Sequence, residues 1–290
     1  MKNIRTSMML GNLSIGVWTA SIGAKGVSRK AETEANAKEG TIKATKKLMA
    51  GVLELEAVQK SATAHRNWWN LQSVPWFDNG PRGYNASRHM DLCVEVGDRK
   101  REHEGLVKDF LKLYPSLRAS RQFDMGEFFD EKEFPTPDIV GRKFHFDFET
   151  SPVPNNEDIR IIDALPKADI DAMIQAGIEQ ENAKVRAGMQ VASERLATVV
   201  AAMHKKLSVK IGDTGHIFRD SLIENIAQLV EIMPGLNITG DPALAQMCKE
   251  AKKLTLYSPD ELREDEDKRA KAAKEAKSLA TKLSGLFADE

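Results

Sequence analysis

Residues 74–84, with the sequence VPWFDNGPRGY, hold the densest group of chemically versatile side chains in the chain. They combine three aromatic rings with a carboxylate, an amide and a guanidinium. Aromatic rings supply contact area and an arginine binds phosphate or carboxylate, so an outward-facing tip of this composition could bind a partner. The candidate binding residues are Trp76, Asp78, Asn79, Arg82 and Tyr84 in this stretch, and Trp68, Trp69 and Arg66 before it.

The same stretch also has a structural interpretation. The segment DNGP at 78–81 has the residue types of a tight turn, because aspartate and asparagine bond to nearby backbone and glycine tolerates positive φ. Trp76 and Phe77 would then fill the core beside this turn. The binding interpretation instead needs Trp76 and Tyr84 to face outward, with His65 extending the same surface.

No established catalytic spacing occurs in the sequence. It contains no Walker-type glycine loop, no G-x-S-x-G, no H-E-x-x-H and no C-x-x-C. His89 and Cys93 lie four residues apart in a predicted helix, but two ligands do not complete a zinc site. We therefore predict a non-enzymatic protein without a cofactor.

Clusters of charge give two further candidates. Asp124, Asp130, Glu131 and Glu133 could hold a divalent cation and, with Asp78, make a metal-dependent hydrolase or nuclease, although a solvated acidic loop has the same composition. The basic residues that could contact phosphate are Lys43, Lys46, Lys47, Arg99, Lys100 and Arg101.

The net charge of −1 conceals an uneven distribution. Residues 1–121 carry 20 lysines and arginines against 12 acids, whereas residues 122–171 carry 5 against 13. A basic first part favours nucleic acid or an acidic partner, and the acidic middle could equally neutralise it within the fold.

Periodicity predicts the elements that position the central stretch. Alternation over 13–19 predicts a strand, and apolar residues at three- and four-residue steps predict one long amphipathic helix over about 30–70. A second helix is predicted over 86–114, and it should stop or kink at Pro115, which lacks an amide donor. The two helices would fold back as an antiparallel hairpin with the central stretch at its tip.

The second half of the chain is predicted to be helical after one further strand. The alternating segment KFHFDFE at 143–149 predicts that strand, and it should pair with 13–19 in a small sheet, preceded by a helical turn and linker over 123–138. Helices are expected at about 167–207, 216–233, 241–256 and 259–287, with Asp241 and Ser258 as N-caps. The last helix is so charged that it should be the least constrained segment.

These elements predict a mainly α fold: a long antiparallel, coiled-coil-like helical hairpin with a small β-sheet and a C-terminal helical region. Three regions are expected, at 1–165, 166–257 and 258–290. Two isolated cysteines, Cys93 and Cys248, and the lack of a clear signal peptide indicate the cytoplasm. No run approaches the roughly 20 apolar residues of a membrane span.

The segments LSIGVWTASIGAK, PWFDNGPRGY, YPSL and PVPNNEDIR, in this order over residues 10–165, resemble an uncharacterised domain-of-unknown-function family of phages and bacterial mobile elements. Members of such families are often encoded near MoxR-like AAA+ ATPases. The resemblance implies a phage or mobile-element protein that acts in the cytoplasm of a bacterial host, with a AAA+ ATPase as one partner. It transfers no catalytic residue.

Three functional hypotheses follow. The first is a non-enzymatic adaptor or scaffold that binds another protein and self-associates along its long helices. The second is a single-stranded nucleic-acid-binding or annealing protein of DNA replication or recombination, with Trp68, Trp69, Trp76 and Tyr84 as stacking platforms. The third is the metal-dependent hydrolase. Exposure of the aromatic side chains along a basic groove would favour the second hypothesis, and their burial would count against it.

Overall fold

A computed structural model describes residues 4–77, 80–155, 166–209 and 218–286. It confirms a mainly helical fold with a small antiparallel sheet. The chain divides into two compact units, each made of separate segments. The helical unit comprises residues 1–12, 69–92 and 149–290, and the hairpin unit comprises 13–68 and 93–148. The three consecutive regions expected from the sequence do not coincide with these units.

Four elements contribute residues to both units. They are β1 (Met8–Gly16), α3 (Leu53–Gln72), α4 (His89–Met125) and β6 (His145–Pro152). No helix in the described residues is long and apolar enough to cross a membrane.

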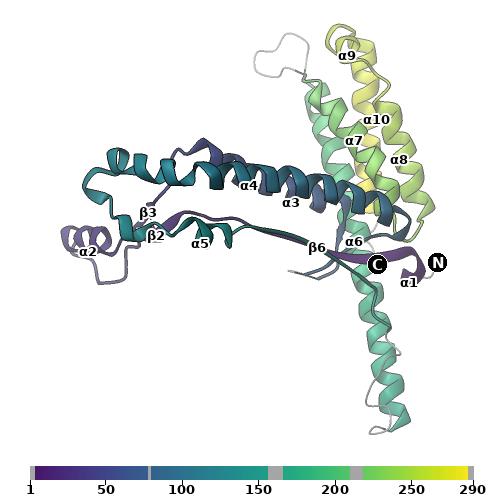
Figure 1. The fold of residues 1–290 in the computed structure, drawn as a ribbon. Coiled ribbons are helices and arrows are strands. Elements are labelled where there is room, and N and C mark those ends of the chain that lie inside the picture. Colours follow the sequence, from purple (N-terminus) through teal and green to yellow (C-terminus); the bar gives the residue numbers. More distant parts are fainter. Residues whose placement is uncertain (1–3, 78–79, 156–165, 210–217, 287–290) are drawn as a thin grey trace. The chain divides into compact units, whose positions relative to one another are not determined.

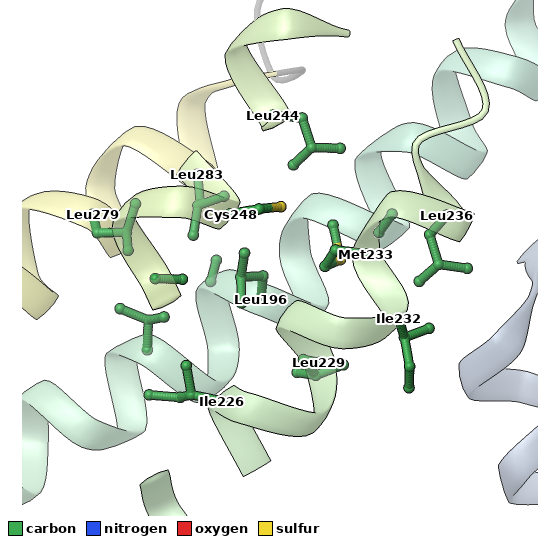
Figure 2. Packing of buried hydrophobic residues seen from close by; sticks show 14 of the residues in the cluster. Leu196, Ile226, Leu229, Ile232, Met233, Leu236, Leu244, Cys248, Leu279 and Leu283 are labelled. Carbon is green, nitrogen blue, oxygen red and sulfur yellow. The ribbon is translucent and has the colours of Figure 1, made fainter. Parts of the chain in front are cut away.

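The helical unit is built around the second half of one long helix. Its own elements are α1 (Ile4–Ser7), β4 (Val74–Pro75), β5 (Arg82–Asn85), the 3-10 helix η1 (Ala86–Arg88), α6 (Lys167–Leu207), α7 (Ser221–Leu236), α8 (Pro242–Leu254), α9 (Pro259–Glu264) and α10 (Glu266–Gly285). Helices α7 and α10 pack against α6, and α8 packs against α7 and α10 (Figure 1). Leu196, Ile226, Met233 and Leu283 interdigitate in the core between them (Figure 2).

The N-caps expected from the sequence are confirmed. The Asp241 carboxylate accepts from the Leu244 amide at 2.8 Å, and Ser258 forms a capping box with Glu261. Each cap satisfies amide groups that have no partner within the helix.

The prediction that the last helix is weakly constrained is wrong. Helix α10 packs against α6 and buries Ala272, Ala276, Leu279 and Leu283, which recur at three- and four-residue steps. Apart from buried Arg269, the charged residues of α10 occupy the other faces, and the alanines leave a narrow apolar stripe along which another helix can approach. A high average charge therefore hid a regular buried face.

The small sheet has the strand order β4-β5-β1-β6. Strand β5 is antiparallel to β4 and to β1, with Gly83 opposite Leu10 and Tyr84 opposite Met9. The expected pairing of the first strand with 143–149 is confirmed, because β6 lies next to β1. The sequence analysis missed β4 and β5, since two and four residues are too few for a periodic pattern.

The hairpin unit packs α3 and α4 against each other in antiparallel directions, as predicted. Ser61 of α3 bonds to His103 of α4, and His65 meets Arg99 one turn along each helix. The unit's own elements are β2 (Ser21–Gly23), α2 (Lys25–Glu34), β3 (Thr45–Lys47), the 3-10 helices η2 (Gly126–Phe128) and η3 (Glu131–Glu133), and α5 (Pro137–Gly141).

Two predicted helix boundaries in this unit are wrong. Residues 30–70 form α2, β3 and α3 rather than one helix, and Gly51, at a φ of 73°, lies in the turn before α3. Helix α4 continues past Pro115 because buried Tyr114 and partly buried Leu117 pack in one cluster on both sides of the proline.

We predict that Leu196→Ala lowers the free energy of unfolding by about 2–5 kcal/mol, because it removes a fully buried side chain at the centre of the helical core. The matched control is Leu256→Ala, at a position 79% exposed in the same unit, where the loss should stay below about 0.5 kcal/mol. Urea unfolding followed by circular dichroism measures both. Equal losses would contradict the position of the core.

Candidate functional site

The central stretch 74–84 lies in the small sheet, where β4 and β5 flank residues 76–81. The binding interpretation, which needs Trp76 and Tyr84 to face outward, is contradicted: Trp76 is 5% exposed and Tyr84 is 1% exposed. The structural interpretation is confirmed for Trp76, which lies in the core. The last turn of α3 covers one face of β5, and the Trp69 ring packs edge-on against the Tyr84 ring at 5.7 Å. The opposite face carries Val74 into the core beside α6.

The other aromatic candidates are also largely covered. Trp69 and His65 are buried, and Trp68 is partly buried beneath the Arg99 guanidinium, 4.2 Å from the ring centroid. Phe77, which the structural interpretation placed in the core, is 44% exposed instead. The Lys184 ammonium of α6 lies 4.2 Å from the centre of its ring. The candidates Asp78 and Asn79 lie outside the described residues.

Most of the basic candidates of the hairpin unit have partners within that unit. Arg66 donates to the Ile15 carbonyl, Arg101 pairs with Asp98, and Lys100 pairs with Glu104.

The acids that could have formed a cation site instead make separate ion pairs and a cap. Asp124 pairs with Arg121, Glu131 with Arg118 and Glu133 with Lys46, and the Asp130 carboxylate accepts from the Lys132 amide.

Metal ligation finds no support in the described part of the chain, where no group of three or more histidine, cysteine or acidic side chains could hold an ion. Of the expected zinc pair, His89 uses Nδ1 in a 2.8 Å hydrogen bond with the Tyr84 hydroxyl.

A pair of arginines converges beside the central stretch. Arg82 donates from Nε to the Ser73 hydroxyl (2.8 Å) and from Nη2 to the Ser73 carbonyl (3.2 Å). Arg195 of α6 donates from Nη1 to the same carbonyl at 3.0 Å and, at 3.5 Å, to that of Leu71. The two guanidinium groups therefore cap carbonyls at the end of α3, where the helix dipole is negative.

The position of Arg195 depends on a close approach of α6 to β4. A Cβ atom at Gly188 would lie 3.0 Å from Val74 Cγ2, so glycine allows this contact. Lys184, Gly188 and Arg195 follow one another at four- and seven-residue steps and share a face of α6. That face carries Lys184 to Phe77 at one end of β4 and Arg195 to Ser73 at the other.

Electrostatics sets this arginine pair apart. Burial and the neighbouring charge of Arg82 lower the pKa of Arg195 to about 10, and burial lowers the pKa of Arg82. Neither side chain forms an ion pair with a carboxylate of the described residues. Two unit charges about 6 Å apart repel by roughly 3 kcal/mol at an effective dielectric constant of about 20. The end of α3 offsets only part of this repulsion.

A second feature, which the sequence analysis did not single out, is the first half of α6. None of its residues from 167 to 184 is buried, whereas ten residues from Val185 onward are. This half still carries an apolar stripe at three- and four-residue steps. The stripe consists of Ile170, Met173, Ile174 and Ile178, with Met173 47% and Ile178 38% exposed. The periodicity was visible in the sequence, but not the absence of a covering element.

Three buried polar side chains lie between α3 and α4 in the hairpin unit. The Ser61 hydroxyl bonds to His65 Nε2 at 2.9 Å and to His103 Nδ1 at 3.2 Å, and Arg99 donates to His65 Nδ1 at 3.4 Å. Because an arginine only donates, His65 carries its proton on Nε2, so the Ser61 hydroxyl receives that bond and donates onward to His103. His103 Nε2–H is then left buried without a partner in the described residues.

Comparisons of the chain with models of protein families, with curated proteins and with solved structures find no match. The function is therefore inferred from the residues of this chain.

We predict that the hairpin unit loses stability as the pH falls through about 6.5. Burial lowers the pKa of both His65 and His103. The charge of Arg99 lowers the pKa of His65 further, and the charges of His65 and Arg66 lower the pKa of His103 further. Below pH 6.5 the unfolded chain takes up protons that the folded chain does not, so the free energy of unfolding decreases, by at most about 1.4 kcal/mol per pH unit per histidine.

Urea unfolding between pH 7.5 and 5.5 measures this loss. The slope should become shallower in the double variant His65→Gln/His103→Gln, whose side chains do not titrate in that range. An unchanged slope would assign the loss to other groups.

Proposed function

We propose that this protein is a non-enzymatic adaptor that binds another protein through the exposed stripe of α6, defined by Ile170, Met173, Ile174 and Ile178. The observation that carries the proposal is the exposure of this regular apolar face on a helix whose second half is buried. An amphipathic helix with apolar anchors at these steps is a common way of docking into a groove or against another helix.

The charges beside the stripe indicate the chemistry of the partner. Asp169, Asp171, Glu179 and Glu181 accompany it, and Lys167 is the one basic residue among positions 167–181. In a parallel pairing of two copies these acids would face one another and repel, as like charges do beside a coiled-coil seam. We therefore favour a different protein with an apolar, basic surface over self-association.

The resemblance to phage and mobile-element proteins supplies a first partner to test. It implies a AAA+ ATPase encoded nearby and a site of action in the bacterial cytoplasm. Both belong to the proposal and add no residue to it.

A single-stranded nucleic-acid-binding protein is the second candidate. The arginine pair Arg82 and Arg195 favours it, because two guanidinium groups that have no carboxylate partner among the described residues suit phosphate. The burial of Trp69, Trp76 and Tyr84 counts against it, because a buried ring offers no face on which a base can stack.

We predict that Ile178→Asp weakens binding to a purified MoxR-like AAA+ ATPase from the same phage or host at least tenfold. Burial of one isoleucine contributes about 1.5–3 kcal/mol, and the new carboxylate would be desolvated. The matched control is Ala176→Asp, which adds the same charge two residues away, on the opposite side of the helix.

Calorimetric titration of the two purified proteins measures this affinity, and light scattering reports whether the chain self-associates. Equal weakening by both variants would indicate a charge effect rather than a docking face. If the ATPase does not bind, and the chain instead forms a dimer that Ile178→Asp dissociates, then the stripe serves self-association and the adaptor proposal is wrong.

For the second candidate we predict weak binding of labelled single-stranded DNA that disappears between 50 and 200 mM NaCl, because only phosphate contacts are accessible. Fluorescence anisotropy across a salt series measures it. Tight binding at 200 mM would put the nucleic-acid function first.

A further inference from the structure

We propose that Arg82 and Arg195 form a binding site for an oxyanion, and that this oxyanion is a carboxylate of an acidic peptide segment. The source of that peptide rests on the proposed adaptor function. The site itself stands on the geometry of the two arginines and is independent of the α6 stripe.

The carbonyls at the end of α3 use only some of the N–H donors of the two arginines. Arg82 bonds through Nε and Nη2, and Arg195 bonds through Nη1 alone. Within the described residues, Arg82 Nη1 and Arg195 Nε and Nη2 have no hydrogen-bond partner, and none of the three is a buried, unsatisfied atom. An arginine offers five N–H groups in a fixed fork, so both side chains can still donate hydrogen bonds to a ligand.

Arg269 also caps carbonyls in the same unit, but it leaves no guanidinium nitrogen without a hydrogen bond. Arg269 is buried and uses every guanidinium nitrogen on backbone carbonyls: Nε on Leu207 and Val209, Nη1 on Leu262, and Nη2 on Lys206. Arg269 is thus a saturated structural arginine of the same unit. Arg82 and Arg195 share one carbonyl and remain partly accessible.

The positive charges of the two arginines also favour a bound anion. Arg82 Nη2 lies 3.2 Å and Arg195 Nη1 lies 3.0 Å from the same Ser73 carbonyl oxygen, so the two cationic groups are close to each other. No carboxylate of the described residues neutralises them. An anion bound between them would remove their repulsion and form charge-assisted, bidentate hydrogen bonds. Among the described residues, the two arginines are therefore arranged to receive a counter-charge.

The neighbouring side chains favour a peptide as the source of the anion. The exposed Phe77 ring and the Lys184 ammonium lie at the other end of the two-residue strand β4 and suit an apolar and a second acidic side chain. The larger aromatic rings of the central stretch, Trp76 and Tyr84, are buried and offer no face on which a base could stack.

The test is calorimetric titration of the full chain at pH 7.5 and 50 mM NaCl with two probes, the peptide acetyl-hexaglutamate-amide and the oligonucleotide (dT)6. The variants are Arg82→Gln, Arg195→Gln and, as a matched control, Arg263→Gln. Arg263 already pairs with Asp220 and Asp260, so its replacement removes the same charge elsewhere in the unit. Circular dichroism verifies that each variant folds.

We expect hexaglutamate to bind the wild type, to bind Arg82→Gln and Arg195→Gln at least tenfold more weakly, and to bind Arg263→Gln within twofold of the wild type. Should the glutamine variants fail to fold, Arg82→Lys and Arg195→Lys keep the charge but lose the planar fork, and a threefold or greater loss supports the site. Unchanged binding in these lysine variants would overturn it.

Three further outcomes would overturn the proposal. Absence of hexaglutamate binding would leave the arginines as helix caps only, and equal losses in all three glutamine variants would indicate a general charge effect. Tighter binding of (dT)6 with the same arginine dependence would assign the site to phosphate. Because Ile178→Asp should bind hexaglutamate like the wild type, failure of the α6 docking face and failure of the arginine site are distinguishable.

Discussion

The close approach of β4 to α6 at Gly188 is the constraint on which the arrangement of the helical unit depends. A Cβ atom there would lie 3.0 Å from Val74 Cγ2, so glycine lets the strand and the helix approach this closely without displacing Val74. This contact directs Val74 and Trp76 into the helical core. It also places Lys184 beside Phe77 and Arg195 beside the end of α3. The burial of the central stretch and the convergence of the arginines thus have one origin.

Burial also separates from solvent a group of residue types that occur in catalytic sites. Ser61, His65 and His103 are linked in a chain of hydrogen bonds, and all three are enclosed between α3 and α4. Because burial lowers the pKa of both histidines, this network makes the stability depend on pH. Within the described residues His103 Nε2 has no hydrogen-bond partner, which adds a cost that the surrounding packing must offset.

Accessible features of two kinds remain in the helical unit, and they have different physical characters. The exposed stripe of α6 is apolar and accompanied by acids, whereas the pair formed by Arg82 of β5 and Arg195 of α6 is cationic. A partner that covered both would need basic residues at one end and acidic residues at the other. Such alternation gives specificity, because a partner with a uniform charge would be repelled by one of the two surfaces.

The sequence by itself determined the class of fold, the position of α6, the strand pairing of β1 with β6 and the caps Asp241 and Ser258. Each of these follows from local periodicity or from the chemistry of a single residue, which a linear pattern records directly. It identified Arg82 as a binding candidate, but it could not supply Arg195, which lies 113 positions away and shows no motif.

Only the tertiary structure decided which faces are covered. The last turn of α3 and the side of α6 near Gly188 enclose Trp69, Trp76 and Tyr84, whose composition alone fitted an exposed tip equally well. The same periodicity that buries the second half of α6 leaves its first half exposed. Burial depends on which segments meet in space, and contacts between distant segments leave no local pattern in the sequence.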